Sequence, residues 1–166
     1  FSQFLRETIL LQESGQPDVK FTLDLPKEAI WIDADASMIG RAVTNLLKNA
    51  GESIDNRKAY QPDHEGEIRI TAAQTDRLVV VEISDNGAGL PEDRARLLEP
   101  YVTNRVSGTG LGLSIVVKTI EEHGGTFILT DAEAFDAAAR PGAKAIIKLP
   151  RLSDSAAQKV DLGIPA

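Results

Sequence analysis

The sequence predicts an α/β fold, a two-layer α/β sandwich in which helices pack on one face of a mixed sheet. The layout of strand-like and helix-like runs along the chain indicates this class. The 42% of hydrophobic residues indicates a globular protein that can bury a core, and no segment is repeated. A chain of 166 residues is long enough for one domain with a sizeable core. Because aromatic residues make up only 5%, that core must consist mainly of Val, Ile, Leu and Ala.

The first elements combine a helical pattern with extended ones. Residues 1 to about 13 are helical in pattern, and a polar break at 14–17 ends them. Residues 19–25 alternate like a half-buried strand, and residues 29–32 form a second short extended run. We therefore expect one helix followed by two extended segments.

A long helix follows, and its apolar residues recur at about 100° per residue. Either Asp33 or Asp35 can cap its N-terminus, and it continues to about Arg57. Two strand-like runs come next, at residues 67–73 and 78–84, with a polar turn between them.

The last third of the chain contains two helices and two strands by pattern. A short helix is expected near residues 91–98, and the glycines at 108–112 lead into a second helix that ends at residues 123–125. Strands at 126–130 and 143–149 complete the sheet. The residues after them form a polar, aperiodic tail.

Composition excludes several classes of function. The net charge of −7 argues against nonspecific binding to nucleic acid, and the absence of cysteine excludes disulfides and thiolate chemistry. No apolar run reaches the roughly 20 residues that span a bilayer, and no signal peptide precedes the domain, so we expect a cytoplasmic domain. Since the chain opens without Met inside a helical pattern, it reads as part of a longer protein, which can itself be an inner-membrane protein.

Two asparagines lie on the apolar side of the long helix. On a helical wheel Asn49 falls between Met38 and Ala42, inside the apolar stripe, and Asn45 lies at its edge. A buried amide without a partner costs about 1–3 kcal/mol, so both amides must have partners. Two interpretations remain open: hydrogen bonds to neighbouring backbone, or ligation of a hard cation by the amide oxygens.

A first glycine motif follows the strand at 78–84. Asp85 stands at the strand end, with Gly87 and Gly89 after it, so its carboxylate can point into a pocket while the backbone passes close to a flat ligand. A carboxylate accepts hydrogen bonds and suits an exocyclic amine such as the amino group of adenine. The alternative is a simple turn at this Asp-Asn-Gly sequence.

A second glycine motif, Gly108-x-Gly110-x-Gly112, runs into a helix. Its backbone N–H groups and the positive end of the helix suit phosphate oxygens. A dinucleotide-binding fingerprint fits poorly, because no strand leads directly into these glycines. Residues 91–107 have glycine at both ends and can form a mobile lid. Within them Arg105 can reach a terminal phosphate, or it is a solvated surface cation.

The four motifs, in chain order, are Asn45-x-x-x-Asn49-Ala50, Asp85-x-Gly87-x-Gly89, Pro100-Tyr101-x-Thr103 and Gly108-x-Gly110-x-Gly112. Together they resemble the ATP-binding domain of sensor histidine kinases, which belongs to the superfamily shared with gyrase, Hsp90 and MutL. The resemblance covers about residues 19–150, and residues 97–126 are similar to NtrY-like nitrogen-regulation kinases. It implies the Bergerat fold, which is an α/β sandwich.

By position, the resemblance implies a site for ATP and Mg²⁺. Asn49 would ligate Mg²⁺ with support from Asn45, and Asp85 would accept from the adenine amino group. Asn45 and Arg105 would be the catalytic residues. The residues that it implies for nucleotide binding are Asn49, Asp85, Gly87, Gly89, Thr103, Gly108, Thr109, Gly110, Leu111 and Gly112.

The resemblance also implies partners for the domain. A histidine on an upstream helix would attack the γ-phosphate, an aspartate of a response regulator receiver domain would then receive it, and the parent protein would be a homodimer. Residues 1–15 would be the remnant of that dimerisation and phosphoacceptor helix, residues 16–150 the catalytic ATP-binding domain, and residues 151–166 a flexible tail. We expect His64 to be solvated and His123 to pair with helix-terminal carbonyls, so neither is the phosphoacceptor.

Relatives that hydrolyse ATP carry a glutamate base where this chain has Asn45, and an amide cannot take a proton near neutral pH. We therefore expect slow hydrolysis at most. The rival functions are a hydrolytic ATPase of the same superfamily, a serine kinase of the anti-sigma-factor type, and a non-catalytic interaction domain with a decayed site. Robust ATP turnover would favour the first rival, and failure to bind any adenine nucleotide would favour the last.

Overall fold

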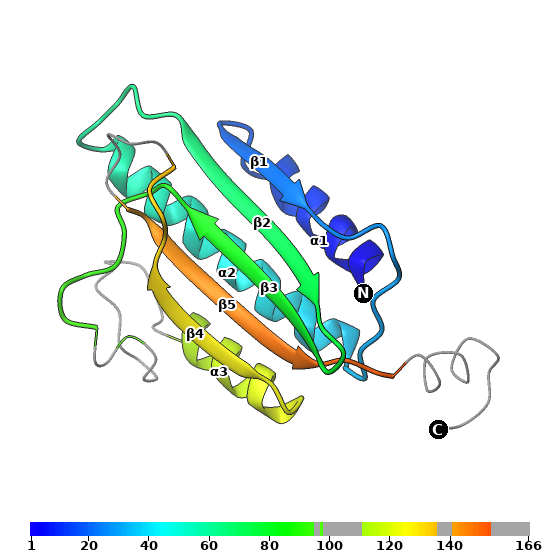
Figure 1. Cartoon of the computed structure of the whole chain (residues 1–166). Helices are drawn as coiled ribbons and strands as arrows, with labels where there is room; N and C mark the ends of the chain where they lie inside the picture. Colours follow the sequence, from blue (N-terminus) through cyan, green and yellow to red (C-terminus); the bar gives the residue numbers. More distant parts are fainter. Residues whose placement is uncertain (95–96, 98–110, 136–140, 154–166) are drawn as a thin grey trace.

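The computed structural model describes residues 1–94, 97, 111–135 and 141–153. These residues contain the following helices and strands: α1 (Ser2–Ser14), β1 (Val19–Asp24), α2 (Ala36–Lys58), β2 (Gly66–Gln74), β3 (Leu78–Asp85), α3 (Gly112–Glu122), β4 (Thr126–Asp131) and β5 (Ala143–Pro150). The strands form a five-stranded sheet in the order β1-β2-β3-β5-β4 (Figure 1). Because β1 and β2 pair in parallel and the other neighbours are antiparallel, the sheet is mixed, as the sequence predicts.

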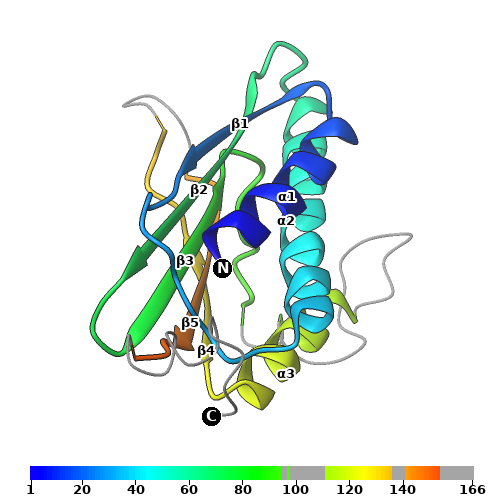
Figure 2. The ribbon, with the colours of Figure 1, turned by 90° about the vertical axis from the view of Figure 1, so that its right-hand side faces the viewer.

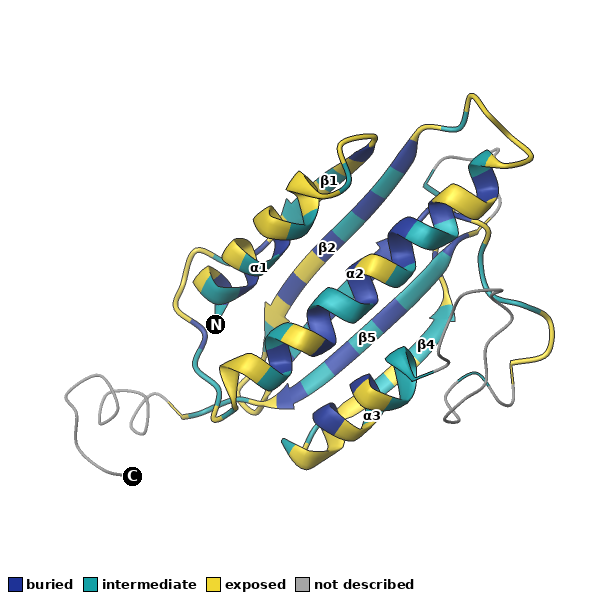
Figure 3. Cartoon of the chain, turned by 180° about the vertical axis from the view of Figure 1, so that it is seen from behind, coloured by how far each residue is buried: buried dark blue, intermediate teal, exposed yellow. Residues whose placement is uncertain are grey.

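The helices lie together on one face of the sheet, which confirms the predicted two-layer α/β sandwich (Figure 2). Side chains alternate along the strands, so that β2 buries Ile68, Ile70 and Ala72 and leaves the residues between them more accessible. The buried side of α2 faces the sheet (Figure 3) and supplies Ile39, Ala42, Val43, Leu46, Leu47, Ala50 and Ile54 to the core. No helix among the described residues combines the length and the hydropathy needed to cross a membrane.

The N-terminus of α2 is joined to the C-terminus of α3. Asp35 caps α2, since its Oδ1 accepts from the Met38 N–H at 2.9 Å, and this decides between the two aspartates that the sequence leaves open. The Asp35 N–H donates to Nε2 of His123 at 3.0 Å, and Nδ1 of His123 lies 2.7 Å from the Thr119 carbonyl oxygen. His123 therefore pairs with a helix-terminal carbonyl, as predicted, and it also connects two helices.

Two predicted elements differ from the structure. Residues 29–32 are not in a strand: Ile30 is fully buried, but the run pairs with none of the strands that the structure describes, and the Trp31 carbonyl accepts instead from the Leu152 N–H at 2.9 Å. An apolar run shows that a segment is buried but does not supply a pairing partner. Residues 91–94 and 97 are not helical, and the rest of the helix predicted near 91–98 lies outside the described residues.

Replacing Asp35 with Ala should lower the free energy of unfolding by about 1 kcal/mol, because the Met38 N–H loses its cap. Asp33→Ala is the matched control. Asp33 is exposed and lies two residues before the cap, so its loss should change the free energy of unfolding by less than about 0.5 kcal/mol. Urea denaturation of both variants measures the difference, and equal losses would contradict the assignment of the cap.

Candidate functional site

Four polar residues follow one another along α2 at intervals of four residues: Asn45, Asn49, Ser53 and Arg57. Four residues advance a helix by about 400°, so these side chains form a slowly turning line on one side of α2, which we call the polar line. The first three are half-buried, and Arg57 is buried. The polar line therefore runs next to the apolar stripe that packs on the sheet.

The middle of the polar line lies beside the beginning of α3. A Cβ atom placed on Gly112 would be 3.9 Å from Nδ2 of Asn49, so this amide is close to the first residue of α3. Leu111, the residue before the helix, makes no side-chain cap hydrogen bond. The first N–H groups of a helix have no partner within the helix and carry partial positive charge. The amide predicted to ligate a metal and a glycine predicted to meet phosphates are thus neighbours.

Asp85 lies at the end of β3, and its carboxylate turns toward α2. Only 5% of the residue is exposed. Its Oδ1 accepts from the Ser53 hydroxyl at 3.0 Å and from the Gly87 N–H at 2.9 Å, and the Ala143 N–H also donates to the carboxylate. Burial raises the pKa of the Asp85 carboxyl, and these hydrogen bonds oppose the rise. Through Ser53, Asp85 contacts the polar line one helical turn away from Asn49.

The turn after β3 is packed directly on the backbone of α2. A Cβ atom on Gly87 would be 2.4 Å from the carbonyl carbon of Ser53 and 2.6 Å from the nitrogen of Ile54, so only glycine fits there. The Ala88 N–H donates to the Ser53 carbonyl oxygen at 2.9 Å. Gly89 has a φ of 78°, in the left-handed region that favours glycine. The first glycine motif is therefore required by contact with α2 and by backbone conformation.

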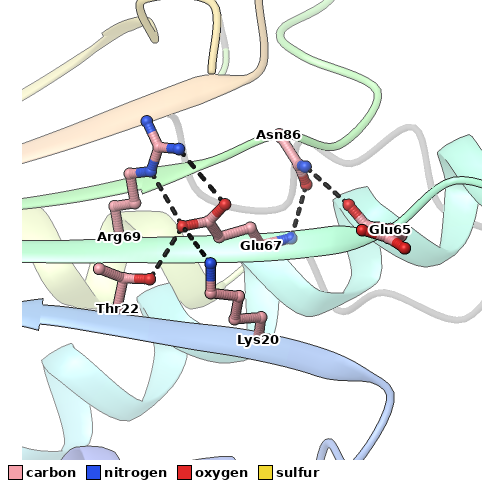
Figure 4. Close-up of polar contacts among 6 residues, drawn as sticks. All are labelled: Lys20, Thr22, Glu65, Glu67, Arg69 and Asn86. Carbon is pink, nitrogen blue, oxygen red and sulfur yellow. Dashed lines mark hydrogen bonds and ion pairs between the residues drawn. The ribbon is translucent and has the colours of Figure 1, made fainter. Parts of the chain in front are cut away.

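Three residues that hold this turn are not identified from the sequence: Ser53, Arg57 and Asn86. The buried Arg57 donates from Nη1 to the carbonyl oxygens of Asn86 at 2.8 Å and of Gly87 at 3.5 Å. The Asn86 side chain accepts from the Glu67 N–H and donates to the Glu65 carbonyl oxygen, both at 2.8 Å (Figure 4). The four-residue spacing along α2 is the signal that could have identified Ser53 and Arg57.

A second polar cluster lies on the sheet face that points away from the helices. Glu67 accepts from Nε of Arg69 at 3.0 Å and from the Thr22 hydroxyl at 2.8 Å, and Nζ of Lys20 is 3.7 Å away (Figure 4). The hydrogen bond from Arg69 is the main reason why the pKa of the Glu67 carboxyl is below its usual value. This cluster joins β1 to β2 and contributes no group to the polar line.

The prediction that His64 is solvated is wrong. His64 is half-buried, and its Nε2 is out of contact with solvent and has no hydrogen-bond partner among the described residues. The loop turns back at this point, because the His64 N–H donates to the Gln61 carbonyl oxygen at 3.0 Å. His64 lines a pocket at the end of the sheet together with Arg57 and Asn86.

Five predicted site residues lie outside the described residues: Thr103, Arg105, Gly108, Thr109 and Gly110. The same holds for most of the predicted lid, of which residues 91–94 and 97 are described. Among the described site residues, the structure brings Asn49 next to Gly112 and Asp85 next to Ser53, the residue one turn after Asn49. Asn45 precedes Asn49 by one turn on the same helix.

Comparison with known proteins identifies relatives of this arrangement. Residues 34–153 match the family described as histidine kinase-, DNA gyrase B- and HSP90-like ATPase. The nitrogen regulation protein NtrY of Azorhizobium caulinodans is 47% identical over 134 residues, which cover 79% of this chain and 17% of NtrY. The chain therefore spans less than a fifth of the length of that relative.

Solved structures share the fold over most of the chain. The mycobacterial sensor histidine kinase MprB is similar with a TM-score of 0.74 at 25% identity, and the match covers 91% of this chain and 95% of that one. The catalytic domain of the histidine kinase ThkA is similar with a TM-score of 0.72 at 28% identity, and the match covers 90% of this chain and 91% of that one. Both likenesses confirm the predicted α/β architecture.

The raised pKa of Asp85 should make part of the stability depend on pH. Below the usual value of 3.8 the carboxyl is protonated in both states. As the pH rises from there through the folded pKa, the unfolded state loses its proton first, so the free energy of unfolding falls. Asp85→Asn lacks this titration. Urea denaturation at a series of pH values should show the wild type losing stability relative to the variant across that window, and a flat or rising difference would contradict it.

Gly87→Ala should lower the free energy of unfolding by roughly 1–3 kcal/mol or more, because the added methyl group meets α2 backbone rather than a flexible side chain. Gly15→Ala is the control. Gly15 has a φ of −85°, and the nearest atom to its added Cβ lies 3.5 Å away, so its substitution should cost less than about 0.5 kcal/mol. Losses of similar size in thermal or urea unfolding would show that close packing at Gly87 is not the constraint.

Proposed function

We propose a function from one premise: this chain belongs to the family of histidine kinase-, DNA gyrase B- and HSP90-like ATPases, and it is an ATP-binding catalytic domain of the sensor histidine kinase type. Its proposed role is to bind Mg·ATP along the polar line and to position the γ-phosphate for transfer to a histidine of the parent protein. An aspartate of a response regulator then receives the phosphoryl group. Because NtrY is named for nitrogen regulation, we place the parent protein in that branch.

One observation carries this proposal: Asp85, at the end of β3, contacts the polar line of α2 one helical turn from Asn49. Asp85 is held by Ser53, one turn from Asn49, and Asn49 lies beside the first residue of α3. A carboxylate suits the amino group of adenine, and an amide oxygen suits a hard cation between phosphates. One extended nucleotide can therefore reach both groups.

The described residues fit a cation that is held mainly by phosphates. They contain no group of three or more His, Cys, Asp or Glu side chains that could hold a metal on its own. Mg²⁺ commonly takes one or two protein ligands and completes its shell with phosphates and water. Asn49 would supply its amide oxygen, with Asn45 in support one turn earlier. When bound, the cation would neutralise charge on the phosphates.

Phosphoryl transfer depends mainly on positioning and on stabilising charge. In the proposed mechanism Asp85 fixes the base, and backbone N–H groups at Leu111 and Gly112 hold phosphate oxygens at the positive end of α3. Arg105 offsets the charge that develops on the transferred group. Asn45 occupies the place of a base that would activate water, so hydrolysis by this domain is slow.

The acceptor histidine has to come from outside the described domain. His123 is engaged at both ring nitrogens by backbone groups, and His64 lies in the loop between α2 and β2, where it lines a pocket with Arg57 and Asn86. We assign residues 1–15 to the end of the dimerisation helix, residues 16–150 to the catalytic domain and residues 151–166 to a tail. The parent protein in this proposal is a homodimeric kinase of the inner membrane.

Asn49→Ala and Asp85→Asn should weaken nucleotide binding in different ways. Titration calorimetry with ATP should show tighter binding by the wild type when Mg²⁺ is present, and Asn49→Ala should lose most of that gain. Asp85→Asn should bind roughly tenfold more weakly or worse in both conditions, because a charged hydrogen-bond acceptor is lost.

Asn56→Ala is the control for this experiment, because Asn56 is an exposed amide on the same helix. It should bind ATP like the wild type with and without Mg²⁺. Unchanged affinity in both the Asn49 and the Asp85 variant would refute the site assignment.

A further inference from the structure

Ser53 connects the long helix to the acid at the end of β3. Its Oγ lies 3.0 Å from Oδ1 of Asp85, across a separation of 32 residues in the chain. A serine inside a helix commonly returns its hydroxyl hydrogen to the carbonyl four residues earlier. A hydroxyl has a single hydrogen to donate, and here that hydrogen is directed across to β3. The contact therefore joins two elements of the site.

The Asp85 carboxylate is close to its full capacity for hydrogen bonds. It accepts from the Ser53 hydroxyl, the Gly87 N–H and the Ala143 N–H. Two carboxylate oxygens offer about four acceptor positions in all. These three donors leave about one position for a ligand, and only a ligand that presents a donor can use it. Among the three, Ser53 is the donor that belongs to a side chain.

The turn that carries Asp85 is held by other contacts besides the Ser53 hydroxyl. The Ala88 N–H binds the Ser53 carbonyl, which is backbone and remains in any variant. Arg57 binds the Asn86 carbonyl, and the Asn86 side chain is fixed in turn by backbone groups on both sides of Gly66. Loss of the hydroxyl should therefore leave the turn in place and remove one of the three donors that orient the carboxylate, whose terminal torsion is otherwise broad.

We propose that Ser53 is a positioning residue for adenine recognition. Its hydroxyl holds the Asp85 carboxylate so that the remaining acceptor position meets the 6-amino group of the base. This inference rests on the proposed function, in which Asp85 accepts from adenine. In this proposal α2 contributes to binding both ends of the nucleotide, because Asn49 ligates the cation at the phosphates and Ser53 orients the acid that binds the base.

The test compares ATP with purine riboside triphosphate, which lacks the 6-amino group, by calorimetry on the whole chain. The wild type should prefer ATP by roughly tenfold or more, as expected for a hydrogen bond to a charged group. Ser53→Ala should reduce that preference by about 3–10-fold and change the affinity for the analogue by less than about twofold. Ser53→Cys, similar in size with a weaker donor, should give an intermediate preference.

Two further variants separate positioning from a general effect on the fold. In an Asp85→Asn background Ser53→Ala should cause no additional loss, because a residue that acts through Asp85 has nothing left to orient. Ser37→Ala removes an exposed hydroxyl from the first turn of the same helix and should bind both nucleotides like the wild type.

The outcomes distinguish this inference from the function on which it rests. If Asp85→Asn retains the full preference for ATP, then Asp85 does not recognise adenine and both proposals fail. If Asp85→Asn loses the preference but Ser53→Ala keeps it, weakens both nucleotides equally, or adds to the Asp85 effect, only the role of Ser53 is overturned. Should Ser53→Ala fail to fold, the Ser53→Cys variant decides by the same comparison.

Discussion

The contact between the backbone of α2 and the turn after β3 is the constraint on which the candidate site depends. No side chain fits between them at Gly87, and the Ala88 N–H is bonded to the Ser53 carbonyl. A helix can approach a turn this closely only if the turn residue has no Cβ atom. Because the approach is so close, the Asp85 carboxylate lies within hydrogen-bond distance of the same helix. The position of the acid thus follows from packing.

Arg57 also holds this turn, through a buried charged group. Its guanidinium is buried and donates to backbone carbonyls of Asn86 and Gly87. A buried charge is costly unless its hydrogen bonds are satisfied, so Arg57 and the turn depend on one another. The chain as a whole carries a net charge of −7, which repels a polyanion. Local groups such as the N–H groups at the beginning of α3 therefore have to offset that field.

Periodicity in the sequence predicted most of the fold, because burial alternates along strands and recurs along helices. The run at residues 67–73 became the strand Gly66–Gln74, for example. The strand predicted at 29–32 is absent because an apolar segment indicates burial but does not specify a strand to pair with. The prediction that His64 is solvated was wrong because a polar loop can fold back on the protein. The acid and the glycines of the site were visible as local motifs. Ser53 was not, since a serine inside a helix acquires its role only from Asp85, which is 32 residues away.

The equal spacing of the polar line has a consequence for how such a domain can vary. At about 1.5 Å of rise per residue, Asn45 and Arg57 are separated by roughly 18 Å along a single rigid rod. One residue inserted between Asn49 and Ser53 would turn one half of the rod by about 100° against the other, and it would uncouple the end near α3 from the end near β3. The site therefore depends on the number of residues between these positions as well as on their identity. α2 thus fixes the distance between the two ends of the site as a number of helical turns.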